Sequence, residues 1–203
     1  MDIKKIMCTF FACISCFNLN ISCVEVLKKI PEDKAIQINT ESKSEVSKTA
    51  LTSLKEAYNF SCIENWQNAL DMDIKAINYY KEKGEREKVN YYEINKYICM
   101  VNLNLEKSKE FPSQENFENL EKHLLEAAYA LSAVGRIEEA RMCLVMSTQA
   151  RIKKNYLQVR ESPSADGWRR IENLCSYAYK TYKNTERKSS QYFRIYSLTA
   201  KAH

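Results

Sequence analysis

A segment of this sequence recurs at intervals of 51 residues. Residues 65–69 align with residues 116–120 and with residues 167–171, and the alignment continues without a gap. Aligned small, large and acidic positions accompany it: Ala76, Ala127 and Ala178; Tyr80, Leu131 and Tyr182; Glu64, Glu115 and Asp166. So many agreements at one spacing indicate a repeated structural unit, which buries its core by stacking on the next unit.

The repeated residues have the spacing of an α-helix. Trp66, Ala69, Ala76 and Tyr80 fall on one stripe that a neighbouring helix can cover. Glycine and proline, which make the turns between strands, number 3 each among 203 residues. We therefore expect an all-α chain with helices at about 45–61, 64–83, 86–109, 114–134, 136–157, 165–183 and 186–201.

The helix ends carry the same residue types in successive units. Ser113 and Ser164 occupy N-cap positions, and each follows a proline that ends the helix before it. Gly84 and Gly135 close their helices where a positive φ is needed. Because the connections are short, successive helices should be antiparallel neighbours.

The spacing of large and small residues resembles a tetratricopeptide repeat (TPR). Two stretches carry the resemblance: Ala57, Phe60, Trp66, Ala69, Leu70, Ala76 and Ile77; then Leu124, Ala127, Ala128, Leu131, Gly135, Ile137, Ala140, Leu144 and Ser147. The family's usual period is about 34 residues, so this chain is more similar to the long-helix branch that includes soluble NSF attachment protein-like arrays. The resemblance implies a right-handed α-solenoid of antiparallel hairpins over residues 44–203, with about seven helices, and it implies a protein-binding scaffold.

The N-terminus is typical of a signal peptide. Lys4 and Lys5 precede an apolar run, Ile6–Phe17, that is shorter than the roughly 20 residues needed to cross a bilayer. A buried N-terminal helix is the alternative, but it does not explain why charge precedes the apolar run. We expect a signal peptide at 1–22, a flexible tether at 23–43, and export to the periplasm, the cell surface or the medium.

Two cysteines in this region suggest a second form of processing. Cys16 and Cys23 each follow Ile-Ser, and a small residue before a cysteine resembles the bacterial lipoprotein signal. That signal usually has leucine three residues before the cysteine, where this chain has Cys13 and Asn20. Lipidation at Cys16 or Cys23 would attach the protein to a membrane; cleavage without lipidation is the favoured alternative.

No residue pattern predicts a catalytic, cofactor or metal site. The histidines are His123 and His203, and His123 has no second histidine at helical spacing, which favours a surface role. No phosphate loop, nucleophile motif or metal-binding cysteine pair occurs, so we expect neither an enzyme nor a cofactor. Four cysteines lie far apart in the sequence after the predicted signal peptide and tether: Cys62, Cys99, Cys143 and Cys175. They either pack as small apolar residues or form disulfides after export.

Aromatic and polar residues suggest a contact surface. Tyr91 and Asn95 follow the first glycine turn, and Arg141 and Arg151 lie on a later helix. Such side chains suit contacts with a peptide backbone or a carboxylate, although packing between hairpins is the alternative role for the tyrosines. We expect a protein or peptide partner, with these four residues as candidate contacts.

Basic residues gather toward the C-terminus. The net charge is only +5, but Trp168–His203 holds eight Lys or Arg residues beside Glu172 and Glu186. Tyrosines alternate with them, as on surfaces that bind single-stranded nucleic acid. Binding of nucleic acid or of an anionic surface is therefore the alternative function, and export disfavours nucleic acid.

Overall fold

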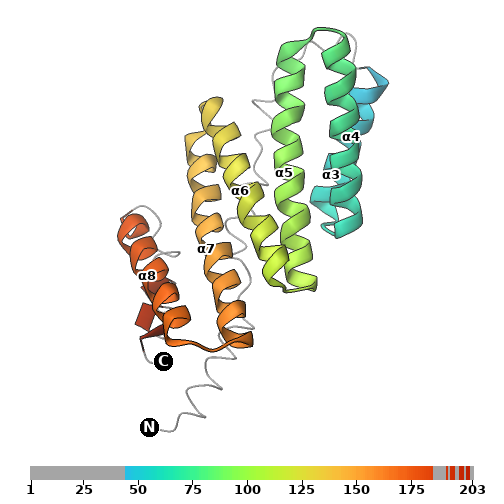
Figure 1. Ribbon diagram of the computed structural model, residues 1–203. Coiled ribbons are helices and arrows are strands. Elements are labelled where there is room, and N and C mark those ends of the chain that lie inside the picture. Colours follow the sequence, from blue (N-terminus) through green and yellow to red (C-terminus); the bar gives the residue numbers. More distant parts are fainter. Residues whose placement is uncertain (1–43, 185–190, 192, 195–196, 199, 202–203) are drawn as a thin grey trace. The chain divides into compact units, whose positions relative to one another are not determined.

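The computed structural model describes residues 44–184, 191, 193–194, 197–198 and 200–201. The chain divides into two units, Met1–Ile38 and Asn39–His203, and all described residues lie in the second. This described part is all-α (Figure 1). It contains no strand, and its helices are α3 (Glu45–Asn59), α4 (Ile63–Glu82), α5 (Arg86–Glu110), α6 (Gln114–Ala133), α7 (Ile137–Glu161) and α8 (Ala165–Tyr182). The predicted signal peptide, tether and lipidation sites lie outside the described residues.

The helix boundaries repeat at the interval found in the sequence. α4, α6 and α8 begin at residues 63, 114 and 165, whereas α5 and α7 begin at 86 and 137 and end at 110 and 161. Corresponding helix starts and ends in successive units are therefore 51 residues apart. The predicted positions of these helices are confirmed within a few residues, and α7 continues beyond its predicted end at 157. The seventh predicted helix, 186–201, lies largely outside the described residues, and those described between 191 and 200 are helical.

The predicted N-caps form in two successive units. The Ser113 hydroxyl accepts a hydrogen bond from the Asn116 N–H at 3.1 Å, and the Ser164 hydroxyl accepts one from the Gly167 N–H, also at 3.1 Å. Each bond satisfies an N–H group that the start of a helix would leave without a partner. One unit earlier, Cys62 holds the N-cap position without a side-chain bond.

Gly84 and Gly135 adopt the predicted left-handed conformation, with φ of 71° and 77°. The Arg136 N–H then donates to the Leu131 carbonyl at 2.9 Å, which closes the last turn of α6. A Cβ would meet no atom within 4 Å at either glycine. Backbone conformation, rather than lack of space, therefore requires glycine here.

Gly135→Ala is expected to lower the free energy of unfolding by about 1 kcal/mol, because an L side chain disfavours this φ. Urea denaturation followed by circular dichroism measures the loss. Gly135→Asn is the matched control and should lose less, since asparagine tolerates the left-handed region better than alanine. An alanine variant as stable as the native protein would contradict the conformational argument.

The repeated stripe forms the core. Its aligned positions are at most 1% exposed in every unit: Ala69, Leu120 and Ile171; Ala76, Ala127 and Ala178. An aromatic residue begins each stripe. Trp66 is fully buried, Phe117 is nearly so, and Trp168 is partly buried. The small alanines let neighbouring helices approach closely, and the larger side chains fill the space between them.

Each helix packs on its neighbours in sequence. Extensive contacts join α3 to α4, α4 to α5, α5 to α6, α6 to α7 and α7 to α8, and consecutive helices run antiparallel (Figure 1). Each helix from α4 to α7 therefore has a neighbour on two sides, and α5 and α7 bury several polar as well as apolar residues. Within the described ranges, no helix is both long and apolar enough to cross a membrane.

Candidate functional site

Two of the predicted contact residues lie one turn apart on α5. Tyr91 is half-buried and packs edge-on against Tyr92, with ring centroids 5.1 Å apart. Asn95 is only 3% exposed, and its Nδ2 has no hydrogen-bond partner. Tyr91 is thus accessible in part to a partner molecule, whereas Asn95 is covered by the protein itself.

Asp73 of α4 meets Cys99 of α5 inside the protein. Asp73 is 0% exposed, and its Oδ2 accepts a hydrogen bond from the Cys99 thiol at 3.4 Å. Its Oδ1 is buried without a hydrogen-bond partner. Asn95 precedes Cys99 by one helical turn on the same face of α5. We call Asp73, Asn95 and Cys99 the polar cluster; it contains one buried donor and one buried acceptor that are unsatisfied.

Burial shifts the ionisation of groups in and around the polar cluster. It raises the pKa of Asp73 to about 7, against a smaller lowering by the Cys99 hydrogen bond. Burial, with the nearby Asp73 charge, raises the pKa of the Cys99 thiol well above its ordinary value. It also raises the pKa of Tyr58 on α3 and brings that of Tyr92 to about 12. Near pH 7 Asp73 is therefore the group whose charge changes, while the thiol and the two phenols stay neutral.

The two predicted arginines lie apart along α7. Arg141 pairs with Glu138 one turn earlier, and its side chain is 37% exposed. Arg151 lies further along the helix by roughly 15 Å, at 1.5 Å per residue. The structure thus brings Tyr91 and Asn95 together on α5 but does not join the two arginines into one site.

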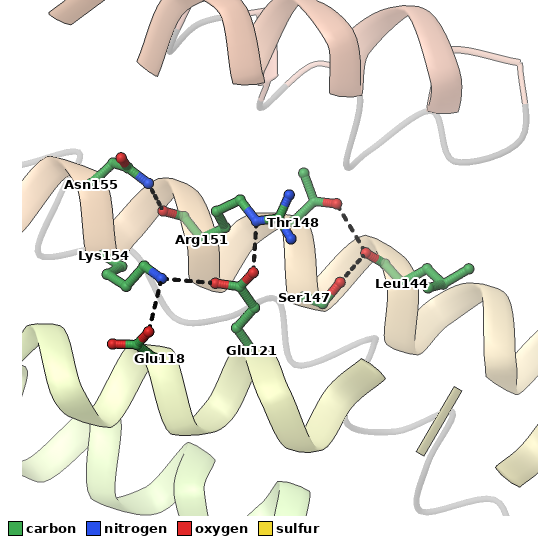
Figure 2. A network of polar contacts seen from close by, with 8 residues as sticks. All are labelled: Glu118, Glu121, Leu144, Ser147, Thr148, Arg151, Lys154 and Asn155. Carbon is green, nitrogen blue, oxygen red and sulfur yellow. Dashed lines mark hydrogen bonds and ion pairs between the residues drawn. The ribbon is translucent and has the colours of Figure 1, made fainter. Parts of the chain in front are cut away.

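Arg151 belongs to an ion-pair network between α6 and α7 (Figure 2). Its Nε donates to Glu121 Oε1 at 2.6 Å, while Lys154 Nζ lies 3.3 Å from Glu121 Oε2 and 3.6 Å from Glu118 Oε1. The Glu121 side chain is 12% exposed, that of Glu118 69% and that of Arg151 47%. A largely buried carboxylate between two cations contributes more than a surface pair. Glu121 therefore joins the two helices, and Arg151 keeps an exposed part.

Glu121→Gln is expected to lower the free energy of unfolding by about 1.5 kcal/mol, because it removes the charge that both cations share. Glu118→Gln is the matched control, and its loss should stay below about 0.5 kcal/mol because that carboxylate is exposed. Urea midpoints of the two variants measure the difference. Equal losses would show that the burial of Glu121 does not strengthen the network.

A second polar contact joins α5 to α6. Asn104 Nδ2 and His123 Nδ1 lie 2.9 Å apart, and the same Nδ2 donates to the Met100 carbonyl at 2.8 Å. Burial lowers the pKa of His123. The expected surface role for His123 is wrong, because the side chain is half-buried and bonded across a helix interface.

The polar cluster carries a sequence signal that pattern reading passed over. Asp73 aligns with Leu124 and Cys175 in the next two units, and Cys99 aligns with Ala150. A carboxylate at a position that is otherwise apolar breaks the local rule for a buried stripe. Positions that break such rules are where functional or strained sites are expected.

The described residues contain no group of three or more His, Cys, Asp or Glu side chains placed to hold a metal ion. Three of the cysteines for which disulfide pairing is the alternative, Cys62, Cys99 and Cys175, carry free thiols, and the fourth, Cys143, is fully buried. Of the four predicted contact residues, the half-buried Tyr91 and the partly exposed Arg141 and Arg151 are accessible to a partner, and Asn95 is not. The chain matches no protein-family model, no curated protein and no solved structure.

Proposed function

We propose that the protein is a non-catalytic scaffold for a protein or peptide partner, built as a right-handed α-solenoid of TPR-like antiparallel hairpins. One observation carries the proposal: the helices pack on their sequence neighbours, and their boundaries repeat every 51 residues. A stack of this kind extends by adding units, and each unit adds side chains to a continuous surface. Such surfaces serve recognition because they position many contacts on a rigid support.

The contacts proposed on this scaffold are Tyr91, Arg141 and Arg151. Each presents part of its side chain to solvent, and both arginines already hold one carboxylate. Tyrosine and arginine supply most of the energy in many protein interfaces, and arginine binds carboxylates in a directional way. An acidic segment of the partner fits this set best. Asn95, which is buried, would support α5 beneath Tyr91.

Export forms part of the proposal and rests on the N-terminal sequence. Mass spectrometry of the mature protein from its native cells tests it. A new N-terminus near residue 23 would support cleavage and secretion, and a lipid on Cys16 or Cys23 would support attachment to a membrane. A mature protein that still begins at Met1 would contradict export.

Partner binding is tested with the full chain and a matched pair of arginines. Arg141 and Arg169 both pair with an acidic residue three positions earlier at a helix start, Arg169 with Asp166 at 3.3 Å. A partner captured from native extracts is purified, and its affinity is measured by titration calorimetry. Arg141→Glu and Arg151→Glu should each weaken binding about tenfold or more, while Arg169→Glu should leave it unchanged. An affinity that none of the three variants changes would contradict the proposed contacts.

Binding to an anionic surface is the second candidate, and the exposed face of α8 favours it. Arg169, Arg170, Tyr177 and Lys180 are all exposed there, and Tyr177 is 68% exposed. Single-stranded oligonucleotides and anionic vesicles serve as probes. This function predicts binding that weakens steeply with salt and that Arg169→Glu abolishes. Failure to bind either probe at low salt would exclude it.

A further inference from the structure

Position 73 holds a carboxylate where the other units hold apolar side chains. Asp73, Leu124 and Cys175 are each 0% exposed, so all three units bury this position equally. On α4, Asp73 lies between two apolar clusters, one containing Ala69 and the other Ala76. A charge at this position is held away from water in the middle of the packing of the first hairpin.

The groups facing Asp73 compensate little for a charge. From α5, the Cys99 thiol is a weak donor to Oδ2, and Tyr92 is close enough for electrostatic interaction. From α3, Tyr58 interacts in the same way. Oδ1 has no hydrogen-bond partner, and none of the cations in the described ranges contributes to the ionisation of Asp73. Ionisation would therefore leave a buried negative charge held by one thiol.

We propose that Asp73 makes the segment from α3 to α5 a pH-sensitive module, which is tightly packed when this carboxyl is protonated and loosens when it ionises.

The direction of the response follows from proton linkage. Burial raises the pKa of Asp73 from 3.8 to about 7, so the folded segment binds the proton more tightly than the unfolded chain does. The stabilisation is complete below about pH 4 and is lost as the pH rises toward 7. Between about pH 4 and pH 7 the equilibrium constant for opening should increase about tenfold per pH unit. Above about pH 7 it should level off.

Other groups with shifted pKa values act in the opposite direction or outside this range. The lowered pKa of His123 makes the folded state more stable as the pH rises through the range in which histidine titrates. Burial lowers the pKa of Lys153 to about 8, which also favours folding as the pH rises, but at higher pH. A comparison of the native chain with a variant at position 73 cancels both contributions.

Hydrogen exchange followed by mass spectrometry tests the proposal on the full chain between pH 5 and pH 8. After correction for the intrinsic exchange rate, amides of α4 and α5 should open about tenfold more often per pH unit below pH 7. Asp73→Asn keeps the shape and removes the charge, so its opening should no longer increase with pH, and only the opposite contribution of His123 should remain. Peptides from α6 and α7 serve as the internal reference and should show no such slope.

Two further variants keep the test decisive. Asp73→Leu places the residue of the aligned position 124 there, and it should likewise lose the increase in opening with pH if the asparagine variant fails to fold. Cys99→Ala removes the hydrogen bond that lowers the pKa of Asp73, so the levelling should move to higher pH. A slope that survives in Asp73→Asn or Asp73→Leu would overturn the assignment to Asp73. An equal slope in α6 and α7 would overturn its restriction to one segment.

Discussion

Trp66→Ala is expected to lower the free energy of unfolding by about 4 kcal/mol, as for other fully buried tryptophans. The side chain is 0% exposed and packs in a cluster with Leu54 and Leu103. Its ring meets Tyr58 edge-on with centroids 5.1 Å apart, and its Nε1 donates to the Ser61 hydroxyl at 2.8 Å. Removing it leaves a large cavity where α3, α4 and α5 meet, whereas the exposed Ser61 hydroxyl keeps its hydrogen bond to Glu106 Oε1.

Thermal denaturation followed by circular dichroism measures this loss, which should lower Tm by roughly 8–16 °C in a domain of this size. Trp168→Ala is the matched control, because Trp168 occupies the same repeat position on α8. It is only half-buried and packs on Tyr156 at 6.1 Å between centroids, so the expected loss is about 2 kcal/mol. Equal losses in the two variants would contradict the difference in burial.

Leu124→Asp is the second change with a large expected effect, since it places in α6 the carboxyl that α4 carries at Asp73. Leu124 is 0% exposed, and the aligned partner of Cys99 on α7 is Ala150, which has no donor. The variant should lose about 4 kcal/mol at pH 7, from lost apolar burial and from a carboxyl without compensation. Part of this loss should be recovered at pH 5, where protonation removes the charge.

Urea denaturation at pH 5 and at pH 7 measures both parts. Leu124→Asn separates them, because it lacks the charge and should lose the same stability at both pH values. Leu144→Asp is the exposure control: Leu144 is 41% exposed, and its loss should stay near 0.5 kcal/mol. A Leu124→Asp variant whose stability does not depend on pH would show that the aspartate reaches water.

Much of the helical architecture could be predicted because its determinants are local. The N-caps at Ser113 and Ser164 need one side chain and one N–H group three residues away. The turn at Gly135 needs only a residue that accepts positive φ. The 51-residue alignment then shows that these local signals recur together, which is why the helix boundaries agree closely with expectation.

The candidate site was harder to predict, because burial and ionisation depend on atoms far away in the sequence. Residue type alone indicates Tyr91, Asn95, Arg141 and Arg151 as contacts. It does not reveal that Asn95 is buried or that Arg151 is paired with Glu121. The expectation that His123 is a surface residue failed for the same reason. Its partner, Asn104, lies on a different helix.

Three properties follow from the amino-acid sequence alone: where the helices begin and end, which stripe of each is apolar, and the repetition of the unit after 51 residues. These properties depend on backbone conformation and on side-chain spacing within a helix. Tertiary packing, by contrast, sets the contacts between helices: Asp73 meets Cys99 and none of the cations among the described residues, and Glu121 lies between Arg151 and Lys154. Those contacts arise when separate helices exclude water from the space between them, and the same exclusion shifts the pKa of Asp73.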